Sequence, residues 1–268
     1  MQDDVLIKKL GQYGISSQAE YISQAFSRNI GLFSREEQER LSRARVAIPG
    51  MGGVGGGHLI TMVRTGIGRF HISDFDVYEP ANVNRQFGAR IPDFGRSKME
   101  TMKEEALSIN PFIDIKEFPT GINNDNIDDF IEGVDIVLDS LDFFAFDVRR
   151  LLFNRAREKG IYVITAGPLG FSSAMLVFAP DKGMGFDEYF NIVAGMKPEE
   201  QYLAFALGLA PKATQFKYMD TSKVSFKSKK GPSLYISCQL CCAMAGTEAV
   251  RVLLGRGEIK SRALLCPD

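Results

Sequence analysis

The sequence is short of cysteine, has no long apolar run and carries no excess of either charge. Its 268 residues include four cysteines without the regular spacing of a disulfide framework, which favours a reducing cytosol over secretion. The 32 basic and 33 acidic residues nearly cancel, so no overall field would attract nucleic acid or an anionic membrane. No stretch of about 18 apolar residues is present, and the chain starts without a basic leader or an apolar signal core. We therefore expect a soluble, cytoplasmic protein that binds neither membrane nor nucleic acid.

A chain of this length can enclose a substantial hydrophobic core, either in one large α/β domain or in two small ones. It contains no internal repeat, no low-complexity tract and no convincing linker. Residues 1–44 are expected to be an N-terminal helical segment, in which Ser34 and Glu37 have the spacing of a capping box. We treat this segment and residues 45–268 as a single domain overall.

The chain is organised around a glycine-rich stretch that follows a short apolar run. Val46 to Ile48 predicts a buried strand, and the apolar residues from Leu59 predict a helix that Gly66 ends. Between them, the G-x-G-x-x-G spacing lets a phosphate approach the backbone N–H groups of a helix N-terminus. The glycines with this spacing are Gly50, Gly52 and Gly55. A glycine-rich turn without a ligand has the same spacing, so the loop alone identifies no site.

Strands and helices alternate after the glycine loop. This rhythm predicts an α/β fold with a Rossmann-like, mostly parallel sheet and helices on both faces. The expected elements are residues 69–75, 97–110, 113–118, 125–132, 134–138, 148–159 and 161–165. The alternation breaks at 166–170, and residues 171–178 predict an antiparallel extension. Residues 181–233 resemble loop, with a basic run at 227–230 that is best explained as solvated, and residues 238–254 predict a last helix.

Acidic residues follow the second strand, where NAD-binding proteins hold a ribose. Asp74 and Asp76 come about 20 residues after the last glycine of the loop, a distance at which a carboxylate accepts hydrogen bonds from ribose hydroxyls. Arg85 and Lys98 come next. A helix N-terminus largely satisfies a pyrophosphate, whereas a triphosphate carries about four charges and needs arginine, lysine and a metal ion as well. The two cations therefore favour a triphosphate over a nicotinamide dinucleotide, although residues of a solvated turn would have the same pattern.

Two further carboxylates follow the fourth expected strand. Asp139 and Asp142 lie at the carboxyl end of a parallel strand, beside the crevice where such sheets bind ligands, and are well placed to hold Mg²⁺. Acidic residues in this position also cap the next helix, which is a sufficient explanation for Asp139. Asp142 is the better candidate for the metal, because it should lie further into the crevice.

These motifs, in their order along the chain, resemble the ThiF/MoeB/HesA family, the adenylating fold also found in ubiquitin-activating enzymes. The resemblance covers residues 26–180 and the late helix 238–254. The glycine loop is unspecific, but the ordered set with Asn-x-x-Arg-Gln and Asp-x-x-Asp is highly specific. The motifs are Gly50-x-Gly52-Gly53-Val54-Gly55, Arg64-Thr65-Gly66-Ile67-Gly68, Asp74-x-Asp76, Asn82-x-x-Arg85-Gln86, Gly95-x-x-Lys98, Ile109-Asn110-Pro111 and Asp139-x-x-Asp142.

The resemblance implies that residues 45–268 form an ATP-binding adenylation domain that works with Mg²⁺ as a homodimer. Arg28, whose pattern alone suggests a surface residue, matches the arginine that such dimers insert into the partner's ATP site. The implied nucleotide-binding residues are Gly50, Gly52, Gly53, Gly55, Asp74, Asp76, Asn82, Arg85, Gln86 and Lys98. The implied catalytic residues are Arg28, Arg85, Lys98 and Asp142, of which Asp142 would hold the metal.

The chemistry implied by the resemblance is carboxylate activation. A substrate carboxylate would attack the α-phosphorus of ATP and release pyrophosphate, and cationic side chains would neutralise the developing charge. No general base is required, because a carboxylate is already ionised near pH ~7. The sequence does not choose among a ubiquitin-like C-terminus, a peptide carboxylate, a tRNA modification and a small metabolite.

The chain also departs from some relatives. Those that form a thioester keep a cysteine after the last sheet strands, but residues 181–233 contain none, and the cysteines are too few for a zinc site with two Cys-x-x-Cys pairs. Cys238, Cys241 and Cys242 are expected to be small buried packing residues. His58 and His71 lack an evident partner and are expected to be structural. Two other functions stay open: a nonenzymatic scaffold that binds nucleotide, and an NAD-dependent oxidoreductase.

Overall fold

The sheet and its helices follow the order expected for parallel β–α units. We describe residues 2–224, 231–257 and 264–265 of a computed structural model. The strands are β1 (Arg45–Pro49), β2 (Arg69–Ser73), β3 (Asp114–Phe118), β4 (Ile136–Asp139), β5 (Tyr162–Leu169), β6 (Ser172–Phe178) and β7 (Leu264–Leu265). The main helices are α1 (Gln2–Gly11), α2 (Gln18–Ala25), α3 (Arg35–Arg43), α4 (Gly55–Thr65), α5 (Lys98–Ile109), α6 (Ile127–Phe130), α7 (Phe146–Glu158), α8 (Phe186–Tyr189), α9 (Pro198–Leu209) and α10 (Tyr235–Leu254).

The strands form one sheet in the order β3-β2-β1-β4-β5-β6-β7. Strands β1 to β5 run parallel, and β6 and β7 are antiparallel to their neighbours. The strand order reverses between β1 and β4, and a parallel sheet opens a crevice beyond the carboxyl ends of its strands at such a point. The α/β fold class and the antiparallel extension after residue 170 are thereby confirmed.

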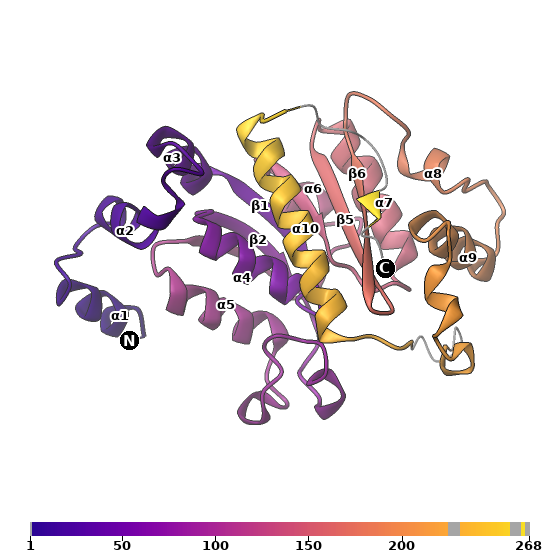
Figure 1. Cartoon of the computed structure of the whole chain (residues 1–268), viewed down its shortest axis with the longest axis horizontal. Coiled ribbons are helices and arrows are strands. Elements are labelled where there is room, and N and C mark those ends of the chain that lie inside the picture. The colour runs from indigo at the N-terminus through magenta and orange to yellow at the C-terminus, as the bar shows by residue number, and fades with distance from the viewer. Residues whose placement is uncertain (1, 225–230, 258–263, 266–268) are drawn as a thin grey trace.

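Two separate apolar cores cover the two faces of the sheet. On one face, α4, α5 and α10 pack against side chains such as Ile48, Ile72 and Leu138. On the other face, α6 and α7, together with α8 and α9, pack against the alternate strand positions, such as Ala47, Val137 and Val163. Because successive strand residues point to opposite faces, a run such as Val46-Ala47-Ile48 supplies both cores at once. Figure 1 shows α10 lying beside α4 across the front of the sheet, with α7 behind it.

Helix α10 is the one described helix that is long and apolar enough to cross a membrane. Here it lies against β5, β6 and α4, and it contributes Cys241, Ala245 and Ala249 to the core of the front face. Cys238 and Cys242 are buried as well, so the expectation that these cysteines are packing residues is confirmed. Cys266 lies outside the described residues.

The structure corrects two expectations for the second half of the chain. The alternation of strand and helix does break as expected, because β5 is followed directly by antiparallel β6, but β5 is longer than the expected strand 161–165: it continues to Leu169 and turns into β6 at Gly170 and Phe171. Residues 181–233 are not simply loop, because they contain α8 and the twelve-residue helix α9. The apolar residues of α9 do not concentrate on one side, so no period of 3.6 identifies it. The basic run at 227–230 lies outside the described residues.

The N-terminal helices pack at the end of α4 that is remote from the glycine loop. The expected capping box of α3 is present, with Ser34 and Glu37 each bonded to the other's backbone. Asn29 and Gln38 both donate side-chain hydrogen bonds to the carbonyl of Thr65, at the C-terminus of α4. Gly66 then ends α4 in the left-handed conformation, as the sequence predicts. The segment before β1 therefore caps the C-terminus of α4, and the glycine loop leads into its N-terminus.

His58 makes the stability of the fold sensitive to acid. Its side chain is fully buried in α4, and neither ring nitrogen has a hydrogen-bond partner among the described residues. Burial lowers the pKa of His58 from 6.5 to about 3. Below pH ~6.5, His58 is protonated in the unfolded chain but stays neutral in the folded chain. The free energy of unfolding therefore falls as the pH falls. From pH ~7 to ~5 we expect a loss of about 2 kcal/mol in the free energy of unfolding.

Urea unfolding at a series of pH values tests this expectation, with His58→Leu as the variant that cannot titrate. The substitution should flatten the pH dependence whatever it does to stability at pH ~7. His71 is the matched control, because a hydrogen bond between its Nδ1 and the Phe130 carbonyl (2.7 Å) opposes the lowering of its pKa by burial. An unchanged slope in His58→Leu would show that another group causes the acid sensitivity.

Candidate functional site

The glycine loop turns tightly, and at Gly50 and Gly55 it passes so close to the residues after β1 and β4 that a Cβ atom would collide with them. Gly50 has φ +95°, and a Cβ on Gly55 would lie 1.7 Å from the Gly50 carbonyl oxygen. Ser140, directly after β4, donates its hydroxyl to the carbonyls of Pro49 and Gly50 at 2.7 and 3.0 Å. Within the described residues, no side chain caps α4. The Gly56 N–H already donates to the Gly52 carbonyl at 3.2 Å. In the part of the chain that the structure describes, the N–H groups of Gly55 and Gly57 are therefore the ones left at this helix terminus, where backbone N–H groups can bind an anion.

Asp74 is placed beside the glycine loop from the end of β2. Its carboxylate accepts hydrogen bonds from the backbone N–H groups of Met51 (2.6 Å) and Asp76 (2.8 Å). Burial raises the pKa of Asp74 above its ordinary value, against the opposing effect of these hydrogen bonds. A carboxylate that is fixed beside the loop and only partly exposed has the position expected for contact with a ribose.

The segment between β2 and α5 returns to the end of β2 and places Lys98 beside Asp76. Lys98 is buried, and its Nζ forms an ion pair with Asp76 at 2.9 Å. Asn82 is also buried, and its side-chain oxygen accepts a hydrogen bond from the Glu79 N–H at 2.9 Å. Asn82 therefore shapes the backbone of this segment. The sequence predicts that Asp76 and Lys98 each bind nucleotide, and in this structure they form an ion pair with each other.

Gln86 is the unsatisfied polar group of the site. It is buried, and its Oε1 has no hydrogen-bond partner among the described residues. Its amide nitrogen lies 3.9 Å from the point that a Cβ on Gly52 would occupy. A buried amide oxygen without a hydrogen-bond partner is costly unless a ligand or water supplies a donor. This orphaned group supports the prediction that Gln86 belongs to a ligand site.

Arg85 belongs to the same segment and lies close to Gly53 of the glycine loop, as does Cys238 at the start of α10. A Cβ on Gly53 would lie 3.2 Å from the Arg85 carbonyl and 3.1 Å from Cys238 Sγ, so only glycine fits comfortably at position 53. The guanidinium donates hydrogen bonds to the Ala81 carbonyl (2.9 Å) and the Asn84 side chain (3.0 Å). Its remaining donors keep it available for an anion.

Asp139 and Asp142 have different environments at the end of β4. Asp139 is buried in an ion pair with Arg149 (2.9 Å), and the same guanidinium donates to the carbonyls of Leu141 and Phe143. Asp142 is exposed, and its Oδ1 accepts a hydrogen bond from the Phe144 N–H. Asp139 therefore pairs with a side chain of α7 and does not cap the helix, whereas Asp142 keeps a carboxylate at the edge of the crevice.

Aromatic side chains of α9 stand beside the loop that carries Asp142. The rings of Phe143 and Phe205 have centroids 5.3 Å apart, and those of Phe144 and Tyr202 are 5.4 Å apart. The Arg149 guanidinium lies 4.7 Å from the centre of the Phe205 ring. Because α9 was expected to be loop, the sequence offered no sign that this helix borders the site.

Arg28 is the one predicted site residue that the structure does not bring to the glycine loop of its own chain. It is exposed in the short 3₁₀ helix Ser27–Asn29, and the neighbouring Asn29 bonds to the C-terminus of α4. The glycine loop opens the N-terminus of α4, which is about 16 Å away along an eleven-residue helix. Within one chain, Arg28 and the glycine loop therefore lie at opposite ends of α4.

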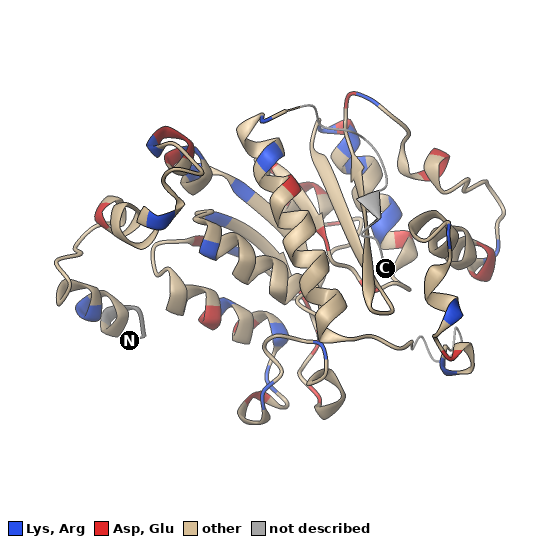
Figure 2. Ribbon diagram, viewed as in Figure 1, with Lys and Arg blue, Asp and Glu red and all other residues tan. Residues whose placement is uncertain are grey.

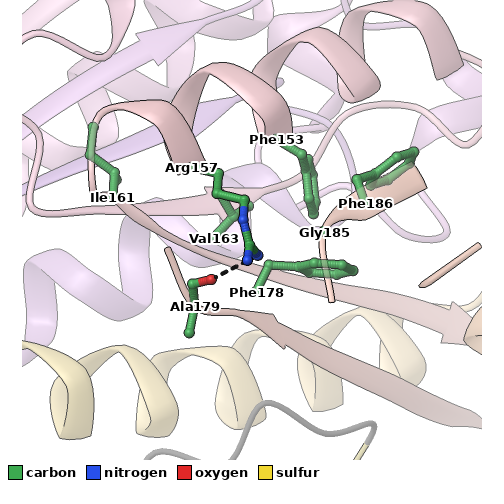
Figure 3. Close-up of a pocket in the computed structure, with 8 residues that line it drawn as sticks. All are labelled: Phe153, Arg157, Ile161, Val163, Phe178, Ala179, Gly185 and Phe186. Carbon is green, nitrogen blue, oxygen red and sulfur yellow. Dashed lines mark hydrogen bonds between the residues drawn. The ribbon is translucent and has the colours of Figure 1, made fainter. Parts of the chain in front are cut away.

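A small cavity elsewhere in the fold is distinct from this site. It is lined by Phe153, Arg157, Ile161, Val163, Phe178, Ala179, Gly185 and Phe186. Figure 3 shows the Arg157 side chain reaching the Ala179 carbonyl, a hydrogen bond of 3.2 Å, and a second one joins it to Gly183. Ala179 follows the end of antiparallel β6, so the cavity lies at the sheet edge opposite the carboxyl ends of the parallel strands. Its polar groups already have partners.

Two positioning residues escaped the sequence analysis. Arg149 orders the β4–α7 loop, and the only sequence sign was an arginine in a helix that follows an acidic strand end. Asn84 donates to the Ser233 carbonyl at 2.9 Å and so ties the Arg85 segment to the residues before α10. Its partner is 149 positions away in the sequence, which no local pattern reveals. Among the described residues, no three candidate metal ligands cluster together.

The comparisons with known proteins identify the family. The model of the ThiF family matches residues 26–266. The chain is 29% identical over 234 residues to the probable adenylyltransferase/sulfurtransferase MoeZ of Mycobacterium tuberculosis, covering 86% of this chain and 53% of MoeZ. The chain thus spans about half the length of this curated relative.

Solved structures share the fold at low sequence identity. PaaA superposes with a TM-score of 0.69 at 20% identity, over 94% of this chain and 72% of PaaA. Escherichia coli MccB with ATP superposes with a TM-score of 0.64 at 20% identity, over 88% of this chain and 65% of MccB. At this identity the likeness establishes the fold.

The two carboxylates at the end of β4 should differ in their contribution to stability. Asp139→Asn leaves the buried Arg149 guanidinium without its counter-charge, which costs about 3–5 kcal/mol in the free energy of unfolding. Asp142→Asn keeps the side-chain oxygen that accepts from Phe144, so it should change stability by less than about 0.5 kcal/mol. Chemical denaturation of both variants measures the contrast. Equal losses would mean that Asp142 has a structural role too.

Proposed function

The chain belongs to the ThiF family, and on that basis we propose that it transfers the adenylyl group of ATP to a substrate carboxylate. The observation that carries the proposal is the convergence of three groups at the carboxyl edge of the sheet. They are the uncapped N-terminus of α4, the basic segment with Arg85 and Lys98, and the exposed carboxylate of Asp142. In the transfer, a carboxylate oxygen bonds to the α-phosphorus as the bond to pyrophosphate breaks.

Each group has a distinct task in this reaction. The N–H groups of the glycine loop and α4 bind phosphate oxygens, and Asp74 holds the ribose. Arg85 and Lys98 hold the triphosphate and offset the charge that grows on the leaving pyrophosphate. For this, Lys98 exchanges the Asp76 carboxylate for a phosphate oxygen. The unpaired Gln86 Oε1 is an acceptor, so the partner that it gains must be a donor, such as a ribose hydroxyl. Asn82 keeps the backbone of the segment in place.

We include Mg²⁺ in the proposal because the donor set suits it. Mg²⁺ is commonly held by one or two carboxylates together with substrate phosphates, and it needs no protein cage. Asp142 is exposed at the crevice, with only one backbone N–H bonded to its carboxylate. The bound ion would supply charge neutralisation at the phosphates, and Asp142 would fix its position.

The relatives support both substrates of the proposed reaction. MoeZ is described as a probable adenylyltransferase, and MccB has been solved with ATP and with MccA. The acceptor of the present chain is accordingly a carboxylate on a ubiquitin-like C-terminus, a peptide or a small molecule. We propose that the reaction takes place in the cytoplasm.

Product analysis with α-labelled ATP distinguishes this function from its alternatives. Acceptor pools of peptides, small folded proteins and carboxylic acids are added with Mg²⁺, and the products are separated. We expect labelled acyl-adenylate, the AMP that its hydrolysis releases, and pyrophosphate to form only when an acceptor pool is present. Asp142→Asn should reduce this turnover by at least about a hundredfold at unchanged melting temperature. ATP binding without turnover in every pool would favour a scaffold, and bound NAD would favour an oxidoreductase.

The position of Arg28 supports a homodimer with shared sites. Because Arg28 lies at the far end of α4 from its own glycine loop, it can serve an ATP site only from a second chain. In a two-fold dimer, each site would combine one subunit's Asp142 with the other's Arg28. Arg28→Ala and Asp142→Ala homodimers should both be inactive.

Mixing the two inactive variants tests this arrangement. Random exchange of subunits makes about half of the dimers mixed, and each mixed dimer has one complete site of two, so activity should return to about a quarter of wild type. Activity is compared before and after brief dissociation of the subunits. If no activity returns although mass spectrometry detects mixed dimers, Arg28 does not act in trans.

A further inference from the structure

The carbonyl groups on both sides of Asp142 accept hydrogen bonds from one buried guanidinium. Arg149 donates to the Leu141 carbonyl and, at 3.3 Å, to the Phe143 carbonyl. Its Nε donates to Asp139 at 2.9 Å. Only 4% of the Arg149 side chain is exposed, so these bonds are shielded from water and are stronger than they would be at the surface. They fix the backbone around Asp142, but none of them reaches its carboxylate.

The direction of the Asp142 carboxylate depends on the residue two positions later. Its Oδ1 accepts a hydrogen bond from the Phe144 N–H at 2.9 Å, and the Ala145 N–H donates to the Asp142 carbonyl at 3.0 Å. Residues 142–145 therefore form a tight turn of the kind that an aspartate side chain stabilises. Asp142 is exposed, so neighbouring side chains do not confine its carboxylate. The position of the Phe144 backbone accordingly sets where the carboxylate points.

Tyr202 of α9 fixes the position of Phe144. The two rings lie edge to face, with centroids 5.4 Å apart and an interplanar angle of 85°, an arrangement that aromatic pairs favour. The Tyr202 hydroxyl donates to the Phe144 carbonyl at 3.5 Å, which is a long and weak hydrogen bond. The contact between the rings is therefore the stronger of the two. Phe205 packs on the other parts of the loop, 5.3 Å from the Phe143 ring and 4.7 Å from the Arg149 guanidinium.

Helix α9 supplies these contacts without bringing a charge to the loop. Figure 2 shows α9 free of charged residues after its first turn, where Glu199 and Glu200 lie. A basic residue in place of Tyr202 would pair with Asp142 and take the position of a metal ion, whereas a ring leaves the carboxylate available. Tyr202 is also only partly buried, so removing its ring disturbs the core less than removing the buried Phe205 would.

We propose that Tyr202 is a positioning residue, which holds the Asp142 carboxylate in the direction needed to bind Mg²⁺ together with ATP. The proposal rests on the proposed function and adds a residue of α9 to the metal site. The contacts run from the Tyr202 ring to Phe144, and through the Phe144 N–H to Asp142 Oδ1. Residues that orient a metal ligand without touching the metal typically contribute about ten- to a hundredfold to its affinity.

The ratio of the ATP dissociation constants without and with Mg²⁺ measures this role directly. Calorimetric titration with the α,β-methylene analogue of ATP gives both constants without any acceptor. Tyr202→Ala should lower the ratio about tenfold, toward that of Asp142→Asn, and leave the constant without Mg²⁺ within about twofold. Tyr202→Phe keeps the ring and should keep the wild-type ratio within about twofold. Tyr202→Leu removes the ring but stays apolar, and it replaces Tyr202→Ala if that variant does not fold.

A double variant tests whether Tyr202 acts through the carboxylate. In an Asp142→Asn background, Tyr202→Ala should lower the ratio no further, because the group that it orients no longer binds the metal. Tyr189→Ala is the matched control. Tyr189 also packs against α9, where its hydroxyl donates to the Gly208 carbonyl at 3.2 Å, but this contact lies at the far end of the helix from Tyr202. The control should lower the melting temperature and leave the ratio unchanged.

Three results would overturn the positioning role. They are an unchanged ratio in folded Tyr202→Ala and Tyr202→Leu, an equal loss in Tyr189→Ala, or a further loss in the Asp142→Asn background. A wild-type ratio that Asp142→Asn does not change would refute the metal site and the positioning role together. A ratio that depends on Asp142 but not on Tyr202 would refute the positioning role alone. A ratio that depends on both residues, without adenylation of any acceptor pool, would refute the proposed transfer reaction alone.

Discussion

The close approach of backbone to backbone at the glycine loop is the constraint on which the site depends. A side chain at position 55 would collide with the Gly50 carbonyl, and one at position 53 would press on Arg85 and Cys238. Because these side chains are absent, α4 begins directly at the ends of β1 and β4. The other groups of the site lie on the segments that pack around the N-terminus of α4.

Three elements close around the glycine loop, and each is fixed by a polar contact of its own. Asp74 holds the loop from β2 through the Met51 N–H. Ser140 holds it from β4 through two carbonyls. Asn84 joins the Arg85 segment to the residues that lead into α10. The site is therefore assembled from both sides of the point where the strand order reverses, which is where open α/β sheets bind their ligands.

The buried ion pair of Asp139 and Arg149 holds α7, the loop after β4 and α9 together beside the site. The guanidinium orders the loop that carries Asp142 and also lies against Phe205, so it connects α7, the β4 loop and α9. Removing either charge would leave the other buried and uncompensated, which explains why a structural role fits Asp139 better than a metal ligand.

The sequence by itself determined the glycine loop, the parallel β–α alternation, the buried cysteines and the helix caps at Ser34 and Gly66, because these depend on spacing and on residue types that act locally. The preference for Asp142 over Asp139 as metal ligand, based on position along a strand end, stays a prediction. Tertiary structure alone decided the rest. Helix α9 lacks an apolar stripe, and the partners of Asn84 and Arg149 follow from packing between distant segments. The placement of Arg28 at the far end of α4 likewise arises from contacts with Thr65 that no local pattern contains.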